Sequence, residues 1–119
     1  MWEVLYTDQF EAWWDELSDA QQDALDARVR LLAEFGPRLG RPAVDRIATS
    51  RHHNMKELRA SSDGTLRVLF AFDPLRQAIL LIGGDKAGDW NAWYVRMVPV
   101  ADDLLDEYLE ELDQGKGSV

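Results

Sequence analysis

The sequence predicts an α+β fold, with helices beside a small antiparallel sheet of about four strands. Two patterns carry this prediction. Residues 8–35 and 90–112 repeat apolar side chains every three or four positions, which is typical of amphipathic helices. Residues 55–84 instead contain short apolar or alternating runs separated by turn residues, which is typical of strands. The order along the chain predicts an N-terminal helix hairpin, then the sheet, then a C-terminal helix.

The first third of the chain supplies one strand and two helices. WEVLY at residues 2–6 alternates in polarity and is rich in β-favouring types, so it predicts a first strand. Thr7 or Asp8 can cap the helix that follows. Asp8 with Glu11 has the spacing of a capping box. Ser18, with Gln21 three residues later, caps the second helix, which a Gly-Pro pair ends. The short link between the helices predicts an antiparallel hairpin.

The middle of the chain changes to a sheet pattern after an irregular segment at residues 36–54, which Gly and Pro punctuate. Three runs then predict an antiparallel meander that the first strand can join, at residues 55–60, 65–72 and 78–84. In the final helix, Pro99 is expected to break or kink the backbone. Residues 114–119 are expected to form a flexible tail after a single domain at residues 1–113.

The composition excludes several classes of site. The chain has 119 residues, enough for one domain with a core of its own. It has no cysteine, which excludes disulfides, thiolate metal ligands and cysteine nucleophiles. No segment reaches the ~18 apolar residues of a membrane span, and the N-terminus lacks a signal-peptide pattern. We therefore expect a cytoplasmic protein.

The charge of the chain is unevenly distributed. The net charge is −9, yet residues 1–27 carry −8 and residues 100–119 carry −6, which leaves +5 on residues 28–99. A negative total argues against nucleic acid as a ligand, because a phosphate backbone is usually met by basic surface. The basic middle of the chain keeps that class of ligand open.

The strand patterns bring three charged residues to one face. Arg67 interrupts the apolar strand at residues 65–72, and Glu57 and Arg59 share a face of the preceding strand. Together these three side chains would form an acid–base and phosphate-binding set. They also fit a plain cross-strand ion pair, and both interpretations stay open. Lys56 has the wrong parity for this face unless the start of the strand turns it outward.

Other candidate residues lie close to this face in sequence. The stretch RHHNMKELRA contains His52 and His53, which lack the spacing of a helical metal site but can move a proton near neutral pH. An ordinary polar loop is an equal alternative. GGDK places Lys86 after the last strand of the meander. Trp93 and Tyr94 in the next helix are candidates for stacking a base.

These residue types support a narrow range of reactions. No serine has the context of a nucleophile elbow and no carboxylate cluster has the pattern of a magnesium site, so we expect no metal and no cofactor. RNA can be cleaved without either, because its own 2′-OH can attack the adjacent phosphate. The protein then needs a base, cations around the phosphate and a proton donor for the leaving group.

NMKELRA, TLRVLFAF and ILLIGGDK follow one another between a helix hairpin and a final helix. This order resembles the RelE/ParE superfamily of bacterial toxins, most of all its HigB-type, phage-derived branch, over residues 2–112. The resemblance implies a RelE-like fold and the toxin of a type II toxin–antitoxin pair. Active family members cut mRNA in the ribosomal A site by 2′-OH attack without metal. An antitoxin, often one with a helix-turn-helix DNA-binding domain, neutralises them.

Carried over residue by residue, the resemblance implies a catalytic set of Glu57, Arg59, Arg67, Lys86 and Tyr94. We add four candidate RNA contacts: His52, His53, Lys56 and Trp93. The expected partners are an antitoxin and mRNA on the ribosome, with no membrane. The chain departs from RelE in its acidic charge and in having a glutamate where RelE keeps lysines. Two alternatives therefore stay open, a ParE-like protein that binds DNA gyrase and a weakly active module that binds an antitoxin.

Overall fold

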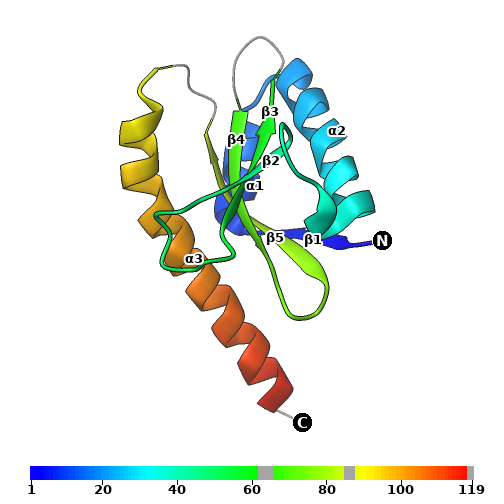
Figure 1. Ribbon diagram of the computed structural model, residues 1–119, viewed down its shortest axis with the longest axis vertical. Helices are drawn as coiled ribbons and strands as arrows, with labels where there is room; N and C mark the ends of the chain where they lie inside the picture. The colour runs from blue at the N-terminus through cyan, green and yellow to red at the C-terminus, as the bar shows by residue number, and fades with distance from the viewer. Residues whose placement is uncertain (62–65, 85–87, 118–119) are drawn as a thin grey trace.

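A mixed sheet forms the centre of the protein (Figure 1). The computed structural model describes residues 1–61, 66–84 and 88–117, and within them the sheet has five strands. The elements in chain order are β1 (Glu3–Tyr6), α1 (Asp8–Asp15), α2 (Asp19–Phe35), the 3-10 helix η1 (Gly36–Arg38), β2 (Val44–Arg46), β3 (Lys56–Ala60), β4 (Leu66–Phe72), β5 (Gln77–Gly84) and α3 (Trp90–Gly117). The strand order is β1-β5-β4-β3-β2, with β1 parallel to β5 and every other pair antiparallel. The α+β prediction is confirmed.

Both N-terminal helices begin at caps that the sequence offers. Thr7 rather than Asp8 caps α1, since its hydroxyl oxygen accepts the N–H of Phe10 at 3.0 Å. The capping box forms at the start of α2, between Ser18 and Gln21, and not at Asp8 and Glu11, whose spacing predicted one. The Ser18 hydroxyl oxygen accepts the Gln21 N–H at 3.1 Å, and Gln21 Oε1 accepts the Ser18 N–H at 2.9 Å. These bonds pair N–H groups that the first turn of a helix leaves without a partner.

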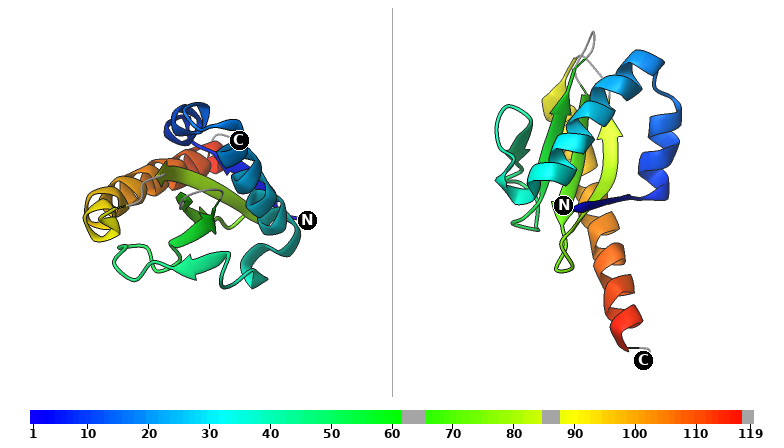
Figure 2. Two further views of the ribbon diagram at one scale, coloured as in Figure 1. Left: turned by 90° about the horizontal axis from the view of Figure 1, so that it is seen from above. Right: turned by 90° about the vertical axis from the view of Figure 1, so that its right-hand side faces the viewer.

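Helices cover both faces of the sheet (Figure 2). α1 and α2 pack on one face over Val68 and Phe70 of β4, whereas α3 packs on the other face over Leu69 and Ala71. The predicted alternation of this strand is therefore confirmed. Because strand side chains point alternately to opposite faces, Arg67 lies on the α3 face.

The sheet differs from the prediction at both of its edges. β2 lies in the segment predicted to be irregular, and it forms because it can pair with β3, where Val44 stands opposite Leu58 and both are buried. β1 joins β5 in parallel, so the sheet is mixed and not purely antiparallel.

The final helix differs from the prediction as well. α3 continues through Pro99 without a break and reaches Gly117, so residues 114–117 are helical. Proline cannot donate to the carbonyl four residues earlier. That carbonyl belongs to Val95, which is exposed like Pro99, so water can take the place of the missing N–H. No helix within the described residues is long and apolar enough to cross a membrane.

Two adjacent glycines of β5 each receive a tryptophan ring. A Cβ on Gly83 would lie closer than 3.0 Å to the ring of Trp13, and a Cβ on Gly84 would lie 2.5 Å from Nε1 of Trp93. Consecutive strand residues face opposite sides, so α1 and α3 are each held against the sheet at this point. Glycine is required here because any side chain would push a ring away.

Candidate functional site

Glu57 lies at the centre of a cluster of side chains between β3, β4 and α3. Its side chain is only 4% exposed. Oε2 accepts hydrogen bonds from Nε and Nη2 of Arg59 at 3.1 and 2.8 Å. Oε1 accepts the hydroxyl hydrogen of Tyr94 and lies 3.7 Å from Nε of Arg67. A carboxylate this buried needs cations and donors around it, and two guanidinium groups and a phenol supply them.

Arg67 reaches the cluster from β4, directly opposite Arg59 on β3. Its guanidinium carbon lies 5.2 Å from the centre of the Trp90 ring, a distance typical of a cation–π contact. Its Nε is buried and has no hydrogen-bond partner in the part of the chain that the structure describes. Two neighbouring arginines repel each other, so the carboxylate of Glu57 between them holds the pair together.

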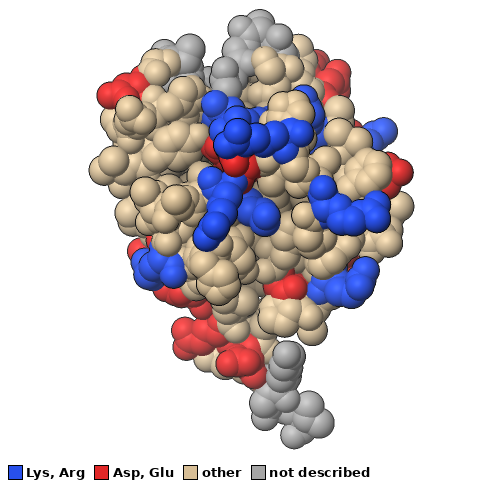
Figure 3. All heavy atoms as spheres, in the orientation of Figure 1, with Lys and Arg blue, Asp and Glu red and all other residues tan. Residues whose placement is uncertain are grey.

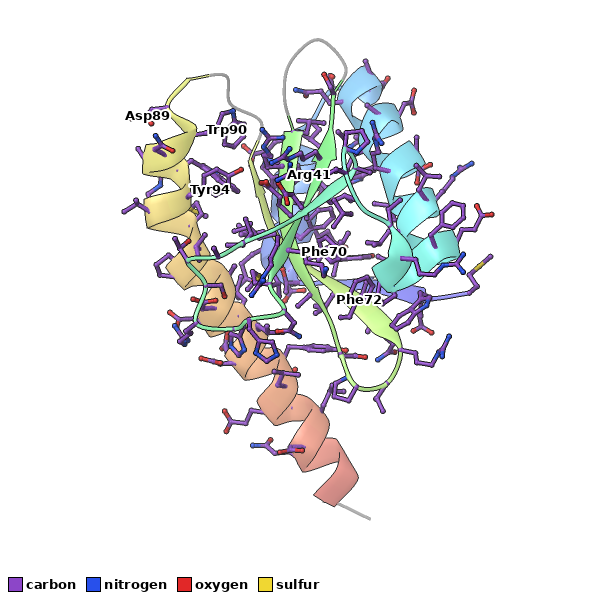
Figure 4. All side chains as sticks on the ribbon, viewed as in Figure 1. Arg41, Phe70, Phe72, Asp89, Trp90 and Tyr94 are labelled. Carbon is purple, nitrogen blue, oxygen red and sulfur yellow. The ribbon has the colours of Figure 1, made fainter. Side chains whose placement is uncertain are left out.

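Trp90 and Tyr94 come from the start of α3 and, four residues apart, share one side of the helix. Both point from α3 toward the sheet in Figure 4. Asp89 precedes the helix, and its Oδ1 accepts the N–H of Ala92 at 3.1 Å. Burial and the hydrogen bond to Glu57 raise the pKa of Tyr94 to about 12. Tyr94 is therefore protonated at neutral pH, and its hydroxyl donates the hydrogen bond to Glu57.

A second set of ion pairs borders the cluster. Asp45 on β2 accepts a hydrogen bond from Nη2 of Arg59 at 3.2 Å and pairs with Nη2 of Arg41 at 3.1 Å. The N–H of Arg46 and the guanidinium of Arg41 lower the pKa of Asp45. The hydrogen bond to Glu57 raises the pKa of Arg59. On this face, basic side chains gather over the middle around a few acidic atoms, while acidic side chains gather toward the far end of α3 (Figure 3).

A groove of about 600 Å³ opens beside the cluster. One wall is β2 with the residues that follow it, and the other is the first half of α3. Glu57, Arg59 and Tyr94 line it together with Arg46 and Val95. A ligand in the groove would therefore meet a carboxylate, guanidinium groups and a phenol beside an apolar wall, which suits a single-stranded nucleic acid.

The structure brings four of the five predicted catalytic residues together, namely Glu57, Arg59, Arg67 and Tyr94. Lys86 lies outside the described residues. Three residues of the site were absent from the sequence prediction: Arg41, Asp45 and Trp90. The helical spacing of Trp90 and Tyr94 was a signal that could have identified Trp90. Nothing local in the sequence indicates that residues 41 and 45 pack beside β3.

None of the four candidate RNA contacts lines the groove. Nε2 of His52 is 2.7 Å from Oδ1 of Asp106 in the second half of α3, and neither His52 nor the exposed His53 lines the groove. Lys56 alternates with Glu57 and so points to the opposite face. Trp93 is 7% exposed with its ring over Gly84, which leaves no free face for a base. Within the described residues, no three His, Cys, Asp or Glu side chains are grouped as metal ligands.

Comparison with known proteins identifies the family. The model of a family described as phage-derived protein Gp49-like matches residues 12–106. The chain belongs to this Gp49-like family. It is 46% identical over 106 residues to a Mycobacterium tuberculosis protein named toxin HigB3, which covers 89% of this chain and 92% of that protein. It is 43% identical over 111 residues to the protein named toxin HigB2 of the same organism, and it spans 55% of that protein, about half its length.

Solved structures agree with the predicted fold. The isolated Escherichia coli RelE toxin superimposes with a TM-score of 0.60 at 11% identity, over 82% of this chain and 99% of RelE. The RelE–RelB complex of Pyrococcus horikoshii gives a TM-score of 0.53 at 16% identity, over 71% of this chain and 93% of the matched chain. The chain therefore has the RelE-like fold, and its relatives carry HigB toxin names. The predicted resemblance to the HigB-type branch is confirmed.

Proposed function

We propose that this HigB-like chain, the toxin of a toxin–antitoxin pair, cleaves mRNA by metal-independent attack of the 2′-OH on the adjacent phosphate. The cluster around Glu57 supports this proposal. It joins a carboxylate, two guanidinium groups and a protonated phenol beside a groove, and these are the groups that the reaction needs. The resemblance to RelE-like nucleases extends the proposal to mRNA on the ribosome, in the cytoplasm.

The proposed reaction gives each of these groups one step. Glu57 accepts the 2′-OH proton as the 2′-oxygen bonds to phosphorus. Arg59 and Arg67 stabilise the charge that develops on the non-bridging oxygens. The bond from phosphorus to the 5′-oxygen then breaks, and Tyr94 donates its proton to that oxygen. A phenol with a pKa of about 12 can do so, because the leaving ribose alkoxide is a much stronger base.

The hydrogen bond between Tyr94 and Glu57 closes the cycle. Glu57 holds the proton taken from the 2′-OH, and Tyr94 has lost one to the leaving group. Transfer along their hydrogen bond restores both residues. The products are a 2′,3′-cyclic phosphate and a 5′-OH. Lys86 remains a predicted further cation of the site.

The test is primer extension on cellular mRNA after brief induction. The wild type should give new cuts at a fixed position within codons. Glu57→Gln and Tyr94→Phe should each reduce cutting by a factor of roughly 10²–10⁴, the range for loss of an acid–base group. Arg67→Ala should reduce it by roughly 10²–10³, the range for loss of a donor that stabilises developing charge. Arg30→Ala is the matched control, because Arg30 is exposed on α2, away from the cluster, where it forms an ion pair with Asp26. Circular dichroism of each variant checks that the fold is retained.

Two outcomes would contradict the nuclease. Cuts that persist in Arg67→Ala and Glu57→Gln would show that the cluster is not the site. Growth arrest without mRNA cuts would favour the ParE-like alternative, and inhibition of purified DNA gyrase would then be measured.

We further propose that a cognate antitoxin binds this chain, with a helix-turn-helix DNA-binding domain of its own. The solved RelE–RelB complexes, one from Escherichia coli and one from Pyrococcus horikoshii, support a protein partner for this fold. Co-expression of the product of the adjacent gene should restore growth. Growth that stays arrested would contradict this pairing.

A further inference from the structure

The sheet edge formed by β1 lies between two grooves. Among the described strands β1 pairs only with β5, so its outer side has no strand partner. A groove of about 400 Å³ lies between β1, α1 and α2 and contains Val4 and Phe10. A groove of about 640 Å³ lies between β1, the start of α1 and the second half of α3, and contains Leu5 and Tyr108. Tyr6, which is 56% exposed, lines both grooves.

Acidic side chains border both grooves. They are Glu11, Asp15 and Asp26 in the first groove and Asp8, Glu107 and Glu111 in the second. No Lys or Arg of the described chain lines either groove. Arg30 approaches from outside and pairs with Asp26 at 2.9 Å. The fold thus brings the acidic N-terminal and C-terminal segments of the sequence together at one edge of the sheet, where they make an apolar surface with an acidic border.

We propose that the β1 edge docks an extended segment of the antitoxin, which adds to the sheet as a sixth strand. This inference rests on the proposed function, in which the antitoxin is the partner. An added strand would bond to the backbone of β1 and send alternate side chains into the two grooves. The apolar grooves favour apolar side chains of the antitoxin segment, and their acidic border favours Lys and Arg beside them. A second copy of this chain fits poorly, since it would bring the same acids face to face.

The position of this edge determines what the docked segment does. β1 and β2 are opposite edges of the sheet, and Glu57 and its groove lie beside β2 and β3. A segment on β1 leaves that groove uncovered. It therefore anchors the antitoxin to the toxin and does not itself fill the site.

The test compares two variants with the same change in charge. Asp15→Lys with Glu111→Lys reverses one acid in each groove, and both positions lie near the C-terminal ends of their helices, where a cation is favourable. Asp23→Lys with Glu34→Lys reverses two exposed acids of α2 that line neither groove. Isothermal titration with the purified product of the adjacent gene should give a Kd at least tenfold higher for the first variant and within about twofold of wild type for the second.

Hydrogen exchange locates the contact. Amides of residues 3–6 should gain protection in the complex. Protection confined to the groove beside Glu57, equal weakening by both variants, self-association of the chain in place of complex formation, or no binding by this probe would each overturn the inference. Primer extension with the wild type alone reports on the nuclease separately. Cuts without β1 protection would refute only the docking site, and β1 protection without cuts would refute only the nuclease.

Discussion

Gly84→Ala is expected to destabilise the protein through a single contact. The new Cβ would lie 2.5 Å from Nε1 of Trp93, whereas ordinary contacts of a Cβ begin near 3.4 Å. The ring must therefore retreat by roughly 1 Å in a close-packed interior. Trp93 is rigid and buried, so it cannot turn out of the way. Overpacking of this kind lowers the free energy of unfolding by about 1–3 kcal/mol.

Urea denaturation followed by circular dichroism measures this loss. Gly40→Ala is the matched control, because a Cβ at that position meets nothing within 4 Å. It should change the free energy of unfolding by no more than about 1 kcal/mol. The Trp93 ring contacts those of Trp90 and Tyr94, with centroids 5.1 and 5.2 Å away. Gly84→Ala should therefore also displace Tyr94 from Glu57 and reduce RNA cleavage.

A double-mutant cycle tests the assigned cause. Trp93→Phe makes room for the added methyl group, so the double variant should be more stable than the sum of the two single changes predicts, by about 1 kcal/mol or more. If the changes in the free energy of unfolding were strictly additive, Trp93 would not be the residue that the added Cβ of Gly84→Ala displaces. Gly84→Ala with wild-type stability would refute the whole argument.

Three further predictions concern stability. Ser18→Ala removes the capping box of α2 and should lower the free energy of unfolding in urea by about 1 kcal/mol, and an unchanged value would contradict the cap. Tyr108→Phe removes a 2.5 Å hydrogen bond to the buried carboxylate of Asp73 and should lower the free energy of unfolding by about 1.5–3 kcal/mol. A loss smaller than that of Ser18→Ala would contradict this assignment. The raised pKa of Tyr94 stabilises the folded state fully below about pH 10, and this stability is lost as the pH rises toward about 12. Tyr94→Phe should make the alkaline fall in stability shallower, and equal slopes would argue against the Glu57 contact.

Local patterns in the sequence predicted most of the fold. Helix starts, strand alternation and the face of Arg67 all follow from spacing over a few residues, and the structure agrees with them. β2 has only three residues, too few for a strand pattern to show in the sequence. It forms because β3 lies next to it and pairs with it. Proline statistics predicted a break or a kink at Pro99. The break is absent because Val95 is exposed, which lets water satisfy its carbonyl.

Local patterns also predicted most, but not all, of the candidate site. Glu57, Arg59 and Arg67 lie on two neighbouring strands. Because side chains alternate between the two faces of a strand, the sequence alone could place these three on one face. Sequence could not place the start of α3 against that face, because this depends on how the Trp93 ring packs on Gly84 of the sheet. Asp45 was missed because its partner Arg59 meets it only after β2 has paired with β3.

The role of Asp45 also bears on the acidic charge of the chain. Asp45 neutralises Arg41 and Arg59 at the border of the groove, so Asp45→Asn should free positive charge where RNA is expected to bind. Its Oδ1 accepts the Arg46 N–H at 2.8 Å, and asparagine retains that acceptor.

A 2′-O-methylated single-stranded RNA, which 2′-OH attack cannot consume, measures the effect without turnover. Affinity at physiological salt should rise, and the slope of log K against log salt should steepen by up to ~0.7, the value for one more phosphate contact on a single strand. Asp23→Asn changes the net charge equally on an exposed position of α2, across the sheet from the groove. Equal gains in both variants would mean that total charge governs binding. A gain confined to Asp45→Asn would mean that the local field of the groove governs it, because at physiological salt charges more than ~8 Å apart are largely screened. A net charge of −9 is then compatible with RNA as the substrate.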